Sequence, residues 1–342
     1  MQATAQSTLP SLQEPFSIGS VRIPNRLVLA PLAGIGNWFV RWQAKRYGAG
    51  LAVSEMVSSH AIAYRNRRTL AELLRIEERE RCGGPVSIQL FGADPQVMRS
   101  AARAAAGAGA DLIDLNMGCP VPKVCRSGAG AALLEDPERA IALVAAAREG
   151  SCLPVTVKLR CGRRAGERGG VELALRLVRE GGAAAVALHP RPASARHAGA
   201  PDYALAAELA AQLDVPVILS GGMRSAEQIR AVFAQTGVAA VMLARGSLGN
   251  PWLFAQLAGK EQGPPSAEAV LEELSWVIAR AQEHLGAERA CRYLRKHYPW
   301  YVARLGLAKA QARALLARLQ RAATLEQAWA LLAQGAHMRA DP

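Results

Sequence analysis

The stretch GADLIDLNMGCP, residues 109–120, shows the pattern that decides the fold. A short, mostly apolar run at 111–115 is typical of a buried β-strand, and a polar turn with Asn116 and Cys119 follows it directly. Similar runs recur along the chain, several of them continuously apolar, as in parallel strands that are covered on both faces. We predict eight strands, at residues 27–30, 51–56, 86–90, 111–115, 155–159, 185–188, 215–219 and 239–243.

Helical segments separate these strands, at 94–107, 137–149, 170–180 and 226–233. Asp94 and Asp136 each precede a proline, which is typical of an N-cap followed by Pro at the first helical position. Eight β-then-α units in about 250 residues have the size and rhythm of a (β/α)8 barrel. The alternative, an open doubly wound sheet, usually has a Gly-rich turn after its first strand, whereas here that strand ends in APLAG. The predicted fold class is therefore α/β, a TIM barrel.

Composition limits the protein classes. With 342 residues, the chain can bury one large core and a smaller one. No segment has about 18 uncharged apolar residues, and the start lacks the pattern of a signal peptide, so we expect neither a membrane span nor secretion. The six cysteines form no CxxC pair, which fits a reducing cytosol and a cytoplasmic protein without a metal site. A net charge of +13 favours a polyanionic partner.

In such a barrel the chemistry lies at the carboxyl ends of the strands. Nearly every predicted strand end carries a polar or Gly-rich element. These elements are Pro31–Gly34 with Leu32 and Ala33, Glu55, Gln89, Asn116 with Cys119, Lys158 with Arg160, His189 with Arg191, Ser220–Gly222 and Arg245–Gly246. Their convergence predicts one functional site.

Individual strand ends suggest individual roles. The Gly-rich turns after strands seven and eight, with Arg245, predict a phosphate cradle, although tight turns alone would explain the glycines. An inward-facing Lys158 needs an anionic partner, either a reduced flavin or a carboxylate such as Glu55. Gln89 and Asn116 could hydrogen-bond a flavin ring or simply satisfy loop backbone groups. His189 and Arg191 could bind a phosphate or a carbonyl.

Cys119 raises a separate question because it lies beyond the strand, in the turn. A thiol with a pKa of about 8.5 can deliver a proton near physiological pH. A nucleophilic role would need a neighbouring base, and the sequence shows none. Cys125 lies in the same loop and is interpreted as a bystander.

The last quarter of the chain has a different pattern. KEQGPPS, residues 260–266, is typical of a linker, and residues 267–286 form a predicted amphipathic helix. Residues 289–321 contain nine Lys and Arg, no Asp or Glu, and interleaved Tyr and Trp. Such a block can neutralise phosphates and stack bases, although a solvated face of a helical bundle is the alternative. Because a block of this length contains no acidic residue, we favour RNA as its partner.

The sequence resembles the tRNA-dihydrouridine synthase family and is most similar to its bacterial B-type branch. The segments that carry the resemblance are NRLVLAPLAG, GAGLAVSEM, VSIQLFG, IDLNMGCPVPKV, GAGAALL, VTVKLR, LHPR, GNPWLF and RKHYPWYV, between residues 16 and 330. The resemblance implies an FMN-binding barrel and a smaller all-α C-terminal domain that binds tRNA. It also implies reduction of FMN by NADPH, followed by reduction of the C5=C6 bond of a uridine.

The resemblance implies roles for individual residues. Cys119 would donate a proton to uracil C5 while flavin N5 gives hydride to C6, and Asn116 would orient flavin or substrate. The cofactor would be held by Pro31, Leu32, Ala33, Gln89, Lys158, His189, Ser220, Gly221, Gly222, Arg245 and Gly246. The RNA-facing residues would be Arg191, Arg292, Arg295, Lys296 and His297. Three places depart from the family pattern, namely Gly36–Asn37, His189-Pro190-Arg191-Pro192 and Ser220-Gly221-Gly222.

We therefore expect a flexible N-terminal segment at 1–15, the barrel at 16–259, the linker at 260–266 and a helical RNA-binding domain at 267–336, acting as a monomer. Three alternatives remain open. One is the same reaction on ribosomal RNA. Another is a barrel flavoprotein that acts on a free small molecule, such as a dihydroorotate-type dehydrogenase. The third is a non-catalytic RNA-binding factor.

Overall fold

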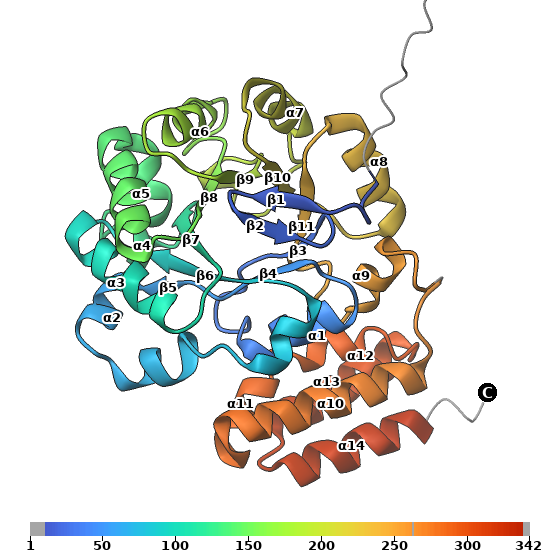
Figure 1. The fold of residues 1–342 in the computed structure, drawn as a ribbon. Coiled ribbons are helices and arrows are strands. Elements are labelled where there is room, and N and C mark those ends of the chain that lie inside the picture. Colours follow the sequence, from blue (N-terminus) through green and yellow to red (C-terminus); the bar gives the residue numbers. More distant parts are fainter. Residues whose placement is uncertain (1–10, 262, 338–342) are drawn as a thin grey trace, which may run out of the picture. The chain divides into compact units, whose positions relative to one another are not determined.

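The computed structural model describes residues 11–261 and 263–337. The chain forms two compact units, Met1–Ala244 and Arg245–Pro342. The first contains the sheet and its surrounding helices, and the second is helical (Figure 1). Within the described residues, no helix is both long and apolar enough to cross a membrane.

Eight parallel strands of the first unit close into a barrel. They are β3 (Leu27–Leu29), β4 (Leu51–Val53), β6 (Val86–Phe91), β7 (Leu112–Met117), β8 (Val155–Arg160), β9 (Ala185–His189), β10 (Val217–Ser220) and β11 (Ala240–Leu243). Each pairs with the next in this order, and β11 pairs back with β3. All eight overlap the predicted strands, so the predicted barrel is confirmed. A further short strand, β5 (Val57–Ser58), pairs with the end of β6 and was not predicted.

Helices follow the strands and surround the barrel (Figure 1). They are α1 (Trp38–Arg46), α2 (Ser59–Ala63), α3 (Pro95–Gly107), α4 (Pro122–Cys125), α5 (Pro137–Ser151), α6 (Gly169–Arg179), α7 (Tyr203–Gln212) and α8 (Ala226–Thr236). The two predicted caps are confirmed, because Asp94 accepts from the backbone N–H of Gln96 at 2.8 Å and Asp136 from that of Arg139 at 3.2 Å. Short helical turns lie at Thr69–Leu73, Glu78–Gly83, Gly130–Glu135 and Ala193–Ala195.

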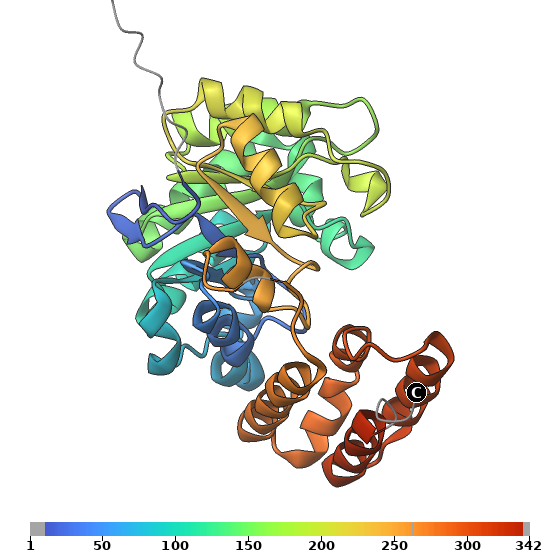
Figure 2. The same cartoon turned by 90° about the vertical axis from the view of Figure 1, so that its right-hand side faces the viewer.

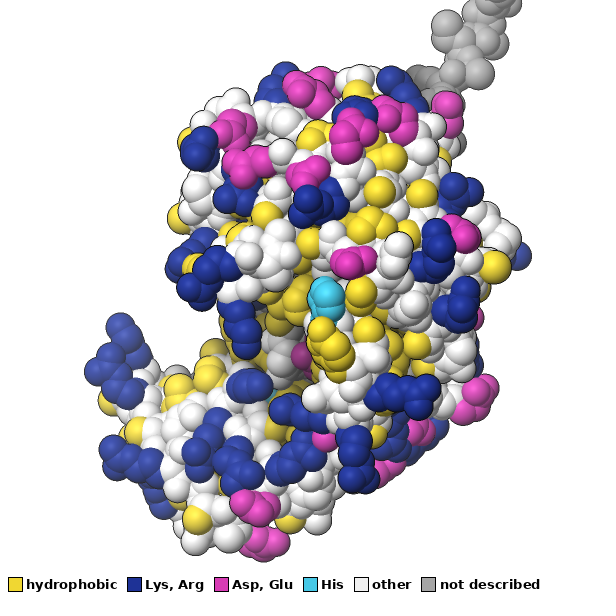
Figure 3. Space-filling model, turned by 90° about the vertical axis from the view of Figure 1, so that its left-hand side faces the viewer, with side chains coloured by type: hydrophobic (Ala, Val, Ile, Leu, Met, Phe, Trp, Pro, Cys, Tyr) yellow, Lys and Arg dark blue, Asp and Glu magenta, His cyan; other side chains and the backbone are white. Residues whose placement is uncertain are grey.

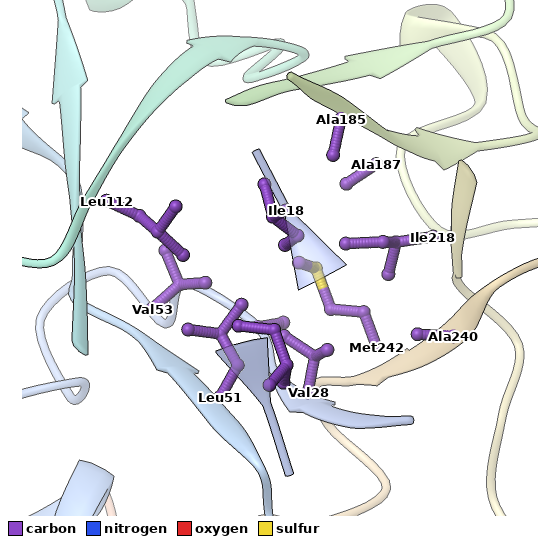
Figure 4. Packing of buried hydrophobic residues seen from close by; sticks show 12 residues of the cluster. Ile18, Val28, Leu51, Val53, Leu112, Ala185, Ala187, Ile218, Ala240 and Met242 are labelled. Atoms are coloured by element: carbon purple, nitrogen blue, oxygen red, sulfur yellow. The ribbon is translucent and has the colours of Figure 1, made fainter. Parts of the chain in front are cut away.

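An antiparallel hairpin, β1 (Phe16–Ile18) and β2 (Val21–Ile23), fills the amino end of the barrel. Ile18 and Ile23 are fully buried, and they pack against side chains from the first residues of the barrel strands. Figure 4 shows Ile18 among Leu51, Leu112 and neighbouring residues. Because these side chains are all apolar, the polar inward residues are confined to the carboxyl end of the barrel.

The second unit consists of helices α9 (Trp252–Leu257), α10 (Ala267–Leu285), α11 (Ala287–Leu294), α12 (Tyr298–Val302), α13 (Lys309–Arg321) and α14 (Leu325–His337). The orange-to-red helices from α10 onward pack as a bundle (Figure 2). The predicted apolar face of α10 is confirmed, since Val270, Leu274 and Val277 are fully buried. Tyr298 and Tyr301 are 1% exposed, so these two aromatics serve the interior rather than base stacking.

The boundaries differ from the predicted ones. Of the N-terminal segment predicted to be flexible, residues 1–10 lie outside the described part of the chain. Residues 11–15 are anchored, because Leu12 is buried and its carbonyl accepts from the backbone N–H of Arg26 at 2.9 Å. The division between the compact units falls after Ala244, so α9 groups with the helices although it precedes the predicted linker.

Candidate active site

The register of the strands brings polar side chains to one end of the barrel. Since alternate residues of a strand face the same side, Asp114 and Asn116 of β7 point inward together, as do Thr156, Lys158 and Arg160 of β8. Inward positions on neighbouring strands lie side by side. The register pairs Gln89 with Asp114, Asp114 with Thr156, Asn116 with Lys158, and Arg160 with His189. The predicted convergence of Gln89, Asn116, Lys158 and His189 is thus present in the structure.

A buried carboxylate that was not predicted as a site residue organises this cluster. Asp114 is 1% exposed and accepts hydrogen bonds from Gln89 Nε2 at 2.6 Å and Thr156 Oγ1 at 2.5 Å. Burial raises the pKa of Asp114 to about 6, whereas the two hydrogen bonds act in the opposite direction. The sequence did contain a sign of this role, because Asp114 stands two residues before Asn116 and therefore lies on the same face of the strand.

Asn116 connects this network to the cysteine turn. Its Nδ2 donates to Gln89 Oε1 at 2.9 Å, and its Oδ1 accepts from the backbone N–H groups of Gly118 at 3.2 Å and Cys119 at 3.0 Å. Such a side-chain-to-backbone turn fixes the chain just beyond the strand. The position of Cys119 is therefore set by Asn116, and through it by Gln89 and Asp114.

The loop after Cys119 folds back over its backbone. The Cys119 carbonyl accepts from the N–H of Ala131 at 3.0 Å. Gly130 adopts a φ of +62°, and a Cβ there would lie 2.7 Å from the Cys119 oxygen. Glycine is therefore required at Gly130 for both conformation and space.

The Cys119 side chain is partly buried, and its burial raises the pKa of the thiol. Arg160 and Lys158 counteract this only as smaller contributions. The thiol therefore stays protonated at neutral pH, which suits a proton donor better than a thiolate nucleophile. The Cys125 Sγ contacts the Cys119 carbonyl oxygen at 3.4 Å rather than providing a base for the thiol.

Lys158 of β8 stands opposite Asn116 of β7 in this arrangement. It is partly exposed, and among the described residues it makes no hydrogen bond or ion pair, so the predicted alternative of a structural pair with Glu55 is not present. Desolvation, and next the positive charge of Arg160, lower the pKa of Lys158 to about 8. Arg160 itself is buried and donates to the carbonyl oxygens of Gly118 and Pro192, both at 3.2 Å.

His189 and Arg191 form a buried pair beyond β9. Arg191 Nη1 lies 3.2 Å from His189 Nε2, and because arginine can only donate, this nitrogen of the histidine accepts. Burial, followed by the surrounding positive charges, strongly lowers the pKa of His189, so the ring is neutral. Arg191 is 6% exposed and also donates to the Gly199 carbonyl at 2.8 Å. The guanidinium is directed inward to hold His189 and the Gly199 loop, and the predicted role of Arg191 in binding substrate or RNA stays a prediction.

The turn after β10 provides backbone donors beside His189. Gly221 and Gly222 have φ values of +100° and +78°, and a Cβ on Gly221 would lie 2.5 Å from His189 Nε2. Among the described residues, the N–H groups of Gly221, Gly222 and Met223 donate to no acceptor. Unpaired N–H groups in such a turn fit an anion such as phosphate. Arg245 and Gly246 follow β11 after Ala244, and their part in phosphate binding stays a prediction.

The departures from the family pattern have local explanations. Gly36 donates to the Leu32 carbonyl at 2.7 Å, and a Cβ there would lie 3.1 Å from the backbone N of Glu55. Asn37 caps α1 by accepting from the N–H of Val40. The carbonyls of Pro190 and Pro192 accept from the Asp202 N–H and from Arg160. Pro31, Leu32 and Ala33 thus lie in a turn fixed by Gly36 and, through Gly34, by the Glu55 carboxylate.

The helical unit divides the predicted RNA-facing residues into two groups. Arg292 and Lys296 are exposed. Arg295 is partly buried and donates to the Ala322 carbonyl at 3.2 Å. His297 is 5% exposed, its ring lies 4.9 Å from that of Tyr293, and burial lowers its pKa to about 4. The helical turn directs the His297 ring inward, and its predicted role in RNA binding stays a prediction.

The residues present fit a flavin by several criteria. Among the described residues, Lys158 makes no hydrogen bond or ion pair, and the N–H groups of the Gly221 turn have no acceptor. One Gln89 amide hydrogen remains available after the bond to Asp114. Asn116, in contrast, already uses both ends of its amide within the protein, including a 3.6 Å contact with Met56 Sδ. Its position favours an orienting role over direct contact with a ligand.

The fold and the site define a (β/α)8-barrel enzyme with its chemistry at the carboxyl ends of the strands. The sequence pattern of one family, described as "Dihydrouridine synthase (Dus)", matches residues 28–335. The chain belongs to this family, which makes the protein an oxidoreductase and confirms the resemblance found in the sequence.

Similar proteins support the same assignment. A protein named tRNA-dihydrouridine synthase B from Xanthomonas axonopodis pv. citri is 36% identical over 291 residues, covering 84% of this chain and 86% of that protein. Another of the same name, from Pseudomonas aeruginosa, is 36% identical over 308 residues and covers 89% and 91%.

Solved structures of low sequence identity share the barrel. A morphinone reductase mutant in complex with tetrahydroNAD has a TM-score of 0.57 at 16% identity, over 76% of this chain and 94% of that one. An old yellow enzyme homologue from Zymomonas mobilis has a TM-score of 0.55 at 16% identity, over 74% and 94%. These likenesses show the fold.

Proposed function

We propose that the protein is an FMN-dependent tRNA-dihydrouridine synthase that reduces the C5=C6 bond of uridines in tRNA with NADPH as the reductant. The observation that carries this proposal is the Asn116 turn, which places a protonated Cys119 thiol at the end of the strand that also carries Asp114. The names of the relatives support tRNA over ribosomal RNA as the substrate.

Each residue has a task in this reaction. FMN, reduced by NADPH, supplies hydride to uracil C6. The Cys119 thiol gives the proton to C5, and its raised pKa keeps that proton available. Lys158 would provide positive charge for a reduced flavin ring, and Gln89, oriented by Asp114, would donate a hydrogen bond to it. Thr156 completes the hydrogen bonding of that carboxylate.

The direct test uses an unmodified tRNA transcript, the purified protein, FMN and NADPH. Dihydrouridine is then measured by mass spectrometry of the digested RNA, with NADH and with ribosomal RNA in parallel reactions. We expect dihydrouridine in the tRNA, formed faster with NADPH. A product only in ribosomal RNA would replace the proposed substrate, and none in either RNA would contradict the function.

The cofactor itself is a separate prediction. Because the turn at Gly221–Met223 offers several backbone donors, we expect a monophosphate flavin, FMN, to be bound. Denaturing the purified protein and identifying the released flavin by mass spectrometry checks this. Release of FAD, or a folded protein that takes up no flavin, would count against the assignment of the turn.

The exposed part of the basic block leads to a second prediction. Replacing Arg292 and Lys296 together with alanine should weaken tRNA binding and reduce the slope of log affinity against log salt by about 0.7–0.9 per lost phosphate contact. Reduction of bound flavin by NADPH should not change. Glu288 pairs with Arg292 at 2.6 Å, so Glu288→Gln serves as a control that should strengthen binding. If the tRNA affinity of the double variant were unchanged at all salt concentrations, the basic block would be a solvated helix surface that does not bind RNA.

A further inference from the structure

A second candidate surface lies on the barrel unit, in the connection that follows β5. Residues 63–68, AYRNRR, are exposed without interruption, and they contain Tyr64 and the arginines Arg65, Arg67 and Arg68. We call residues 60–68 the platform segment. Lys and Arg side chains are visible on the side of the molecule that contains α2 (Figure 3). The site described above does not use this segment.

The platform segment is at the catalytic end of the barrel. The strand β5 pairs Val57 and Ser58 with Leu90 and Phe91 of β6, immediately beyond Gln89. Helix α2 starts at Ser59, directly after β5. The segment therefore leaves the barrel at the carboxyl ends of the strands, where an RNA chain that delivers a uridine to Cys119 must also lie.

Tyr64 is unusually exposed for an aromatic residue. Its exposed fraction is 81%, the highest of the three exposed large hydrophobic residues in the described part of the chain. Another of the three, Leu70 at 40%, follows in the same connection. The Tyr64 ring stacks on His60, with centroids 6.1 Å apart and planes at 27°. One face of the ring is thus supported by the protein, and the side chain otherwise projects into solvent.

The arginines beside Tyr64 are available for an anion. The side chains of Arg65 and Arg67 make no hydrogen bond or ion pair among the described residues, while Arg68 pairs with Glu72 at 3.2 Å and remains 74% exposed. Arg65 occupies a φ of +50°, a left-handed conformation in which glycine would be the least strained residue. Arg65 directly follows Tyr64 in the chain, so an exposed ring and an exposed cation stand on consecutive residues.

The backbone under these side chains is well fixed. Ser58 caps α2 by accepting from the N–H of Ala61 at 3.3 Å, and Asn66 accepts from both the backbone and the hydroxyl of Thr69. Ile62 and Thr69 are buried and anchor the segment from below. The exposed ring and charges are therefore presented by an ordered turn, which lowers the entropic cost of binding.

We propose that the platform segment binds the RNA strand next to the target uridine, with an unpaired base stacked on Tyr64 and phosphates neutralised by Arg65 and Arg67. This inference rests on the proposed function and adds a contact surface on the barrel unit. Aromatic stacking with adjacent guanidinium groups is the chemistry that recognises single-stranded RNA. A protein partner would need a larger apolar area than one ring and Leu70 provide.

The test compares substitutions in the segment with a matched arginine at the opposite end of the barrel. In the full-length flavin-loaded protein, Tyr64→Ala should weaken binding of an unmodified tRNA transcript about tenfold, because stacking contributes about 1–3 kcal/mol per base. Tyr64→Phe should retain the wild-type affinity. The double variant Arg65→Gln, Arg67→Gln should lower the salt slope by about 1.4, two contacts of about 0.7 each. Arg22, exposed on the amino-end hairpin, provides the control Arg22→Gln, with no change expected.

Heparin, a polyanion without bases, separates stacking from charge. Tyr64→Ala should bind heparin like the wild type, whereas the arginine double variant should bind it less. Wild-type tRNA affinity and KM in Tyr64→Ala, or an equal loss in Arg22→Gln, would overturn the proposal. If Tyr64→Ala binds tRNA normally but the wild-type protein still forms dihydrouridine, only the proposed contact surface is rejected. If the wild-type protein forms no dihydrouridine although RNA binding depends on Tyr64, the proposed function is rejected.

Discussion

Replacement of Cys119 by alanine is expected to slow the reduction of uridine by about 10²–10⁴-fold, the usual contribution of a general acid. The thiol is held at the end of β7 by the Asn116 turn, and burial raises its pKa so that it carries the proton needed at C5. The flavin should remain bound, since no flavin contact is assigned to the thiol. Reduction of the flavin by NADPH should also continue, and single-turnover mixing of reduced enzyme with unmodified tRNA measures the affected step.

Cys125→Ala is the matched control for this prediction. Its Sγ lies near the Cys119 carbonyl oxygen, in the same loop, so it tests whether any thiol there would suffice. We expect close to wild-type rates. An unimpaired Cys119→Ala enzyme, or an equal loss in Cys125→Ala, would remove the proton-donor role from Cys119.

Replacement of Gly221 by alanine is expected to destabilise the protein by about 2–5 kcal/mol, of which about 1–2 comes from the backbone at positive φ and about 1–3 from overpacking. A Cβ would lie 2.5 Å from His189 Nε2 and still closer to Cδ2. The ring has little freedom to move, because Arg191 Nη1 already lies 3.2 Å from the same nitrogen. Affinity for FMN should fall as well if the Gly221 N–H contributes to phosphate binding.

Gly237→Ala isolates the backbone contribution. Gly237 has a φ of +63°, but a Cβ there would meet no atom within 4 Å. The denaturant midpoint of Gly221→Ala should therefore be lower than that of Gly237→Ala. In Gly237→Ala, the loss in the free energy of unfolding should be limited to about 1–2 kcal/mol, and the affinity for FMN should be unchanged. Equal midpoints for the two variants would show that the His189 ring moves away from the added methyl group without loss of stability, and would contradict the predicted overpacking.

The barrel strands were predictable because they repeat one strong signal, a short apolar run followed by a helical pattern. Elements that depend on tertiary pairing were not. The strand β5 has only two residues, and the hairpin β1–β2 has strands of three residues, too short for periodicity to indicate. Their positions are set by pairing with β6 and by burial of Ile18 and Ile23 in the amino end of the barrel.

The candidate site was predictable to the extent that strand ends converge in any such barrel. Gln89, Asn116, Lys158 and His189 do come together, because their register places them on inward positions of neighbouring strands. The orientation of side chains was not accessible from the sequence. Arg191 and His297 are turned into the protein by local hydrogen bonding and packing, whereas the family resemblance implied that they contact RNA.

The most direct test of the central claim is whether RNA itself oxidises the reduced enzyme. Protein loaded with FMN is reduced by NADPH without oxygen, excess NADPH is removed, and the enzyme is mixed with a tRNA transcript that contains only unmodified uridine. We predict that flavin absorbance returns and that dihydrouridine appears in equal amount, whereas the same tRNA already carrying dihydrouridine at its target positions leaves the flavin reduced. Oxidation at the same rate by both RNAs, or oxidation without dihydrouridine, would contradict the account.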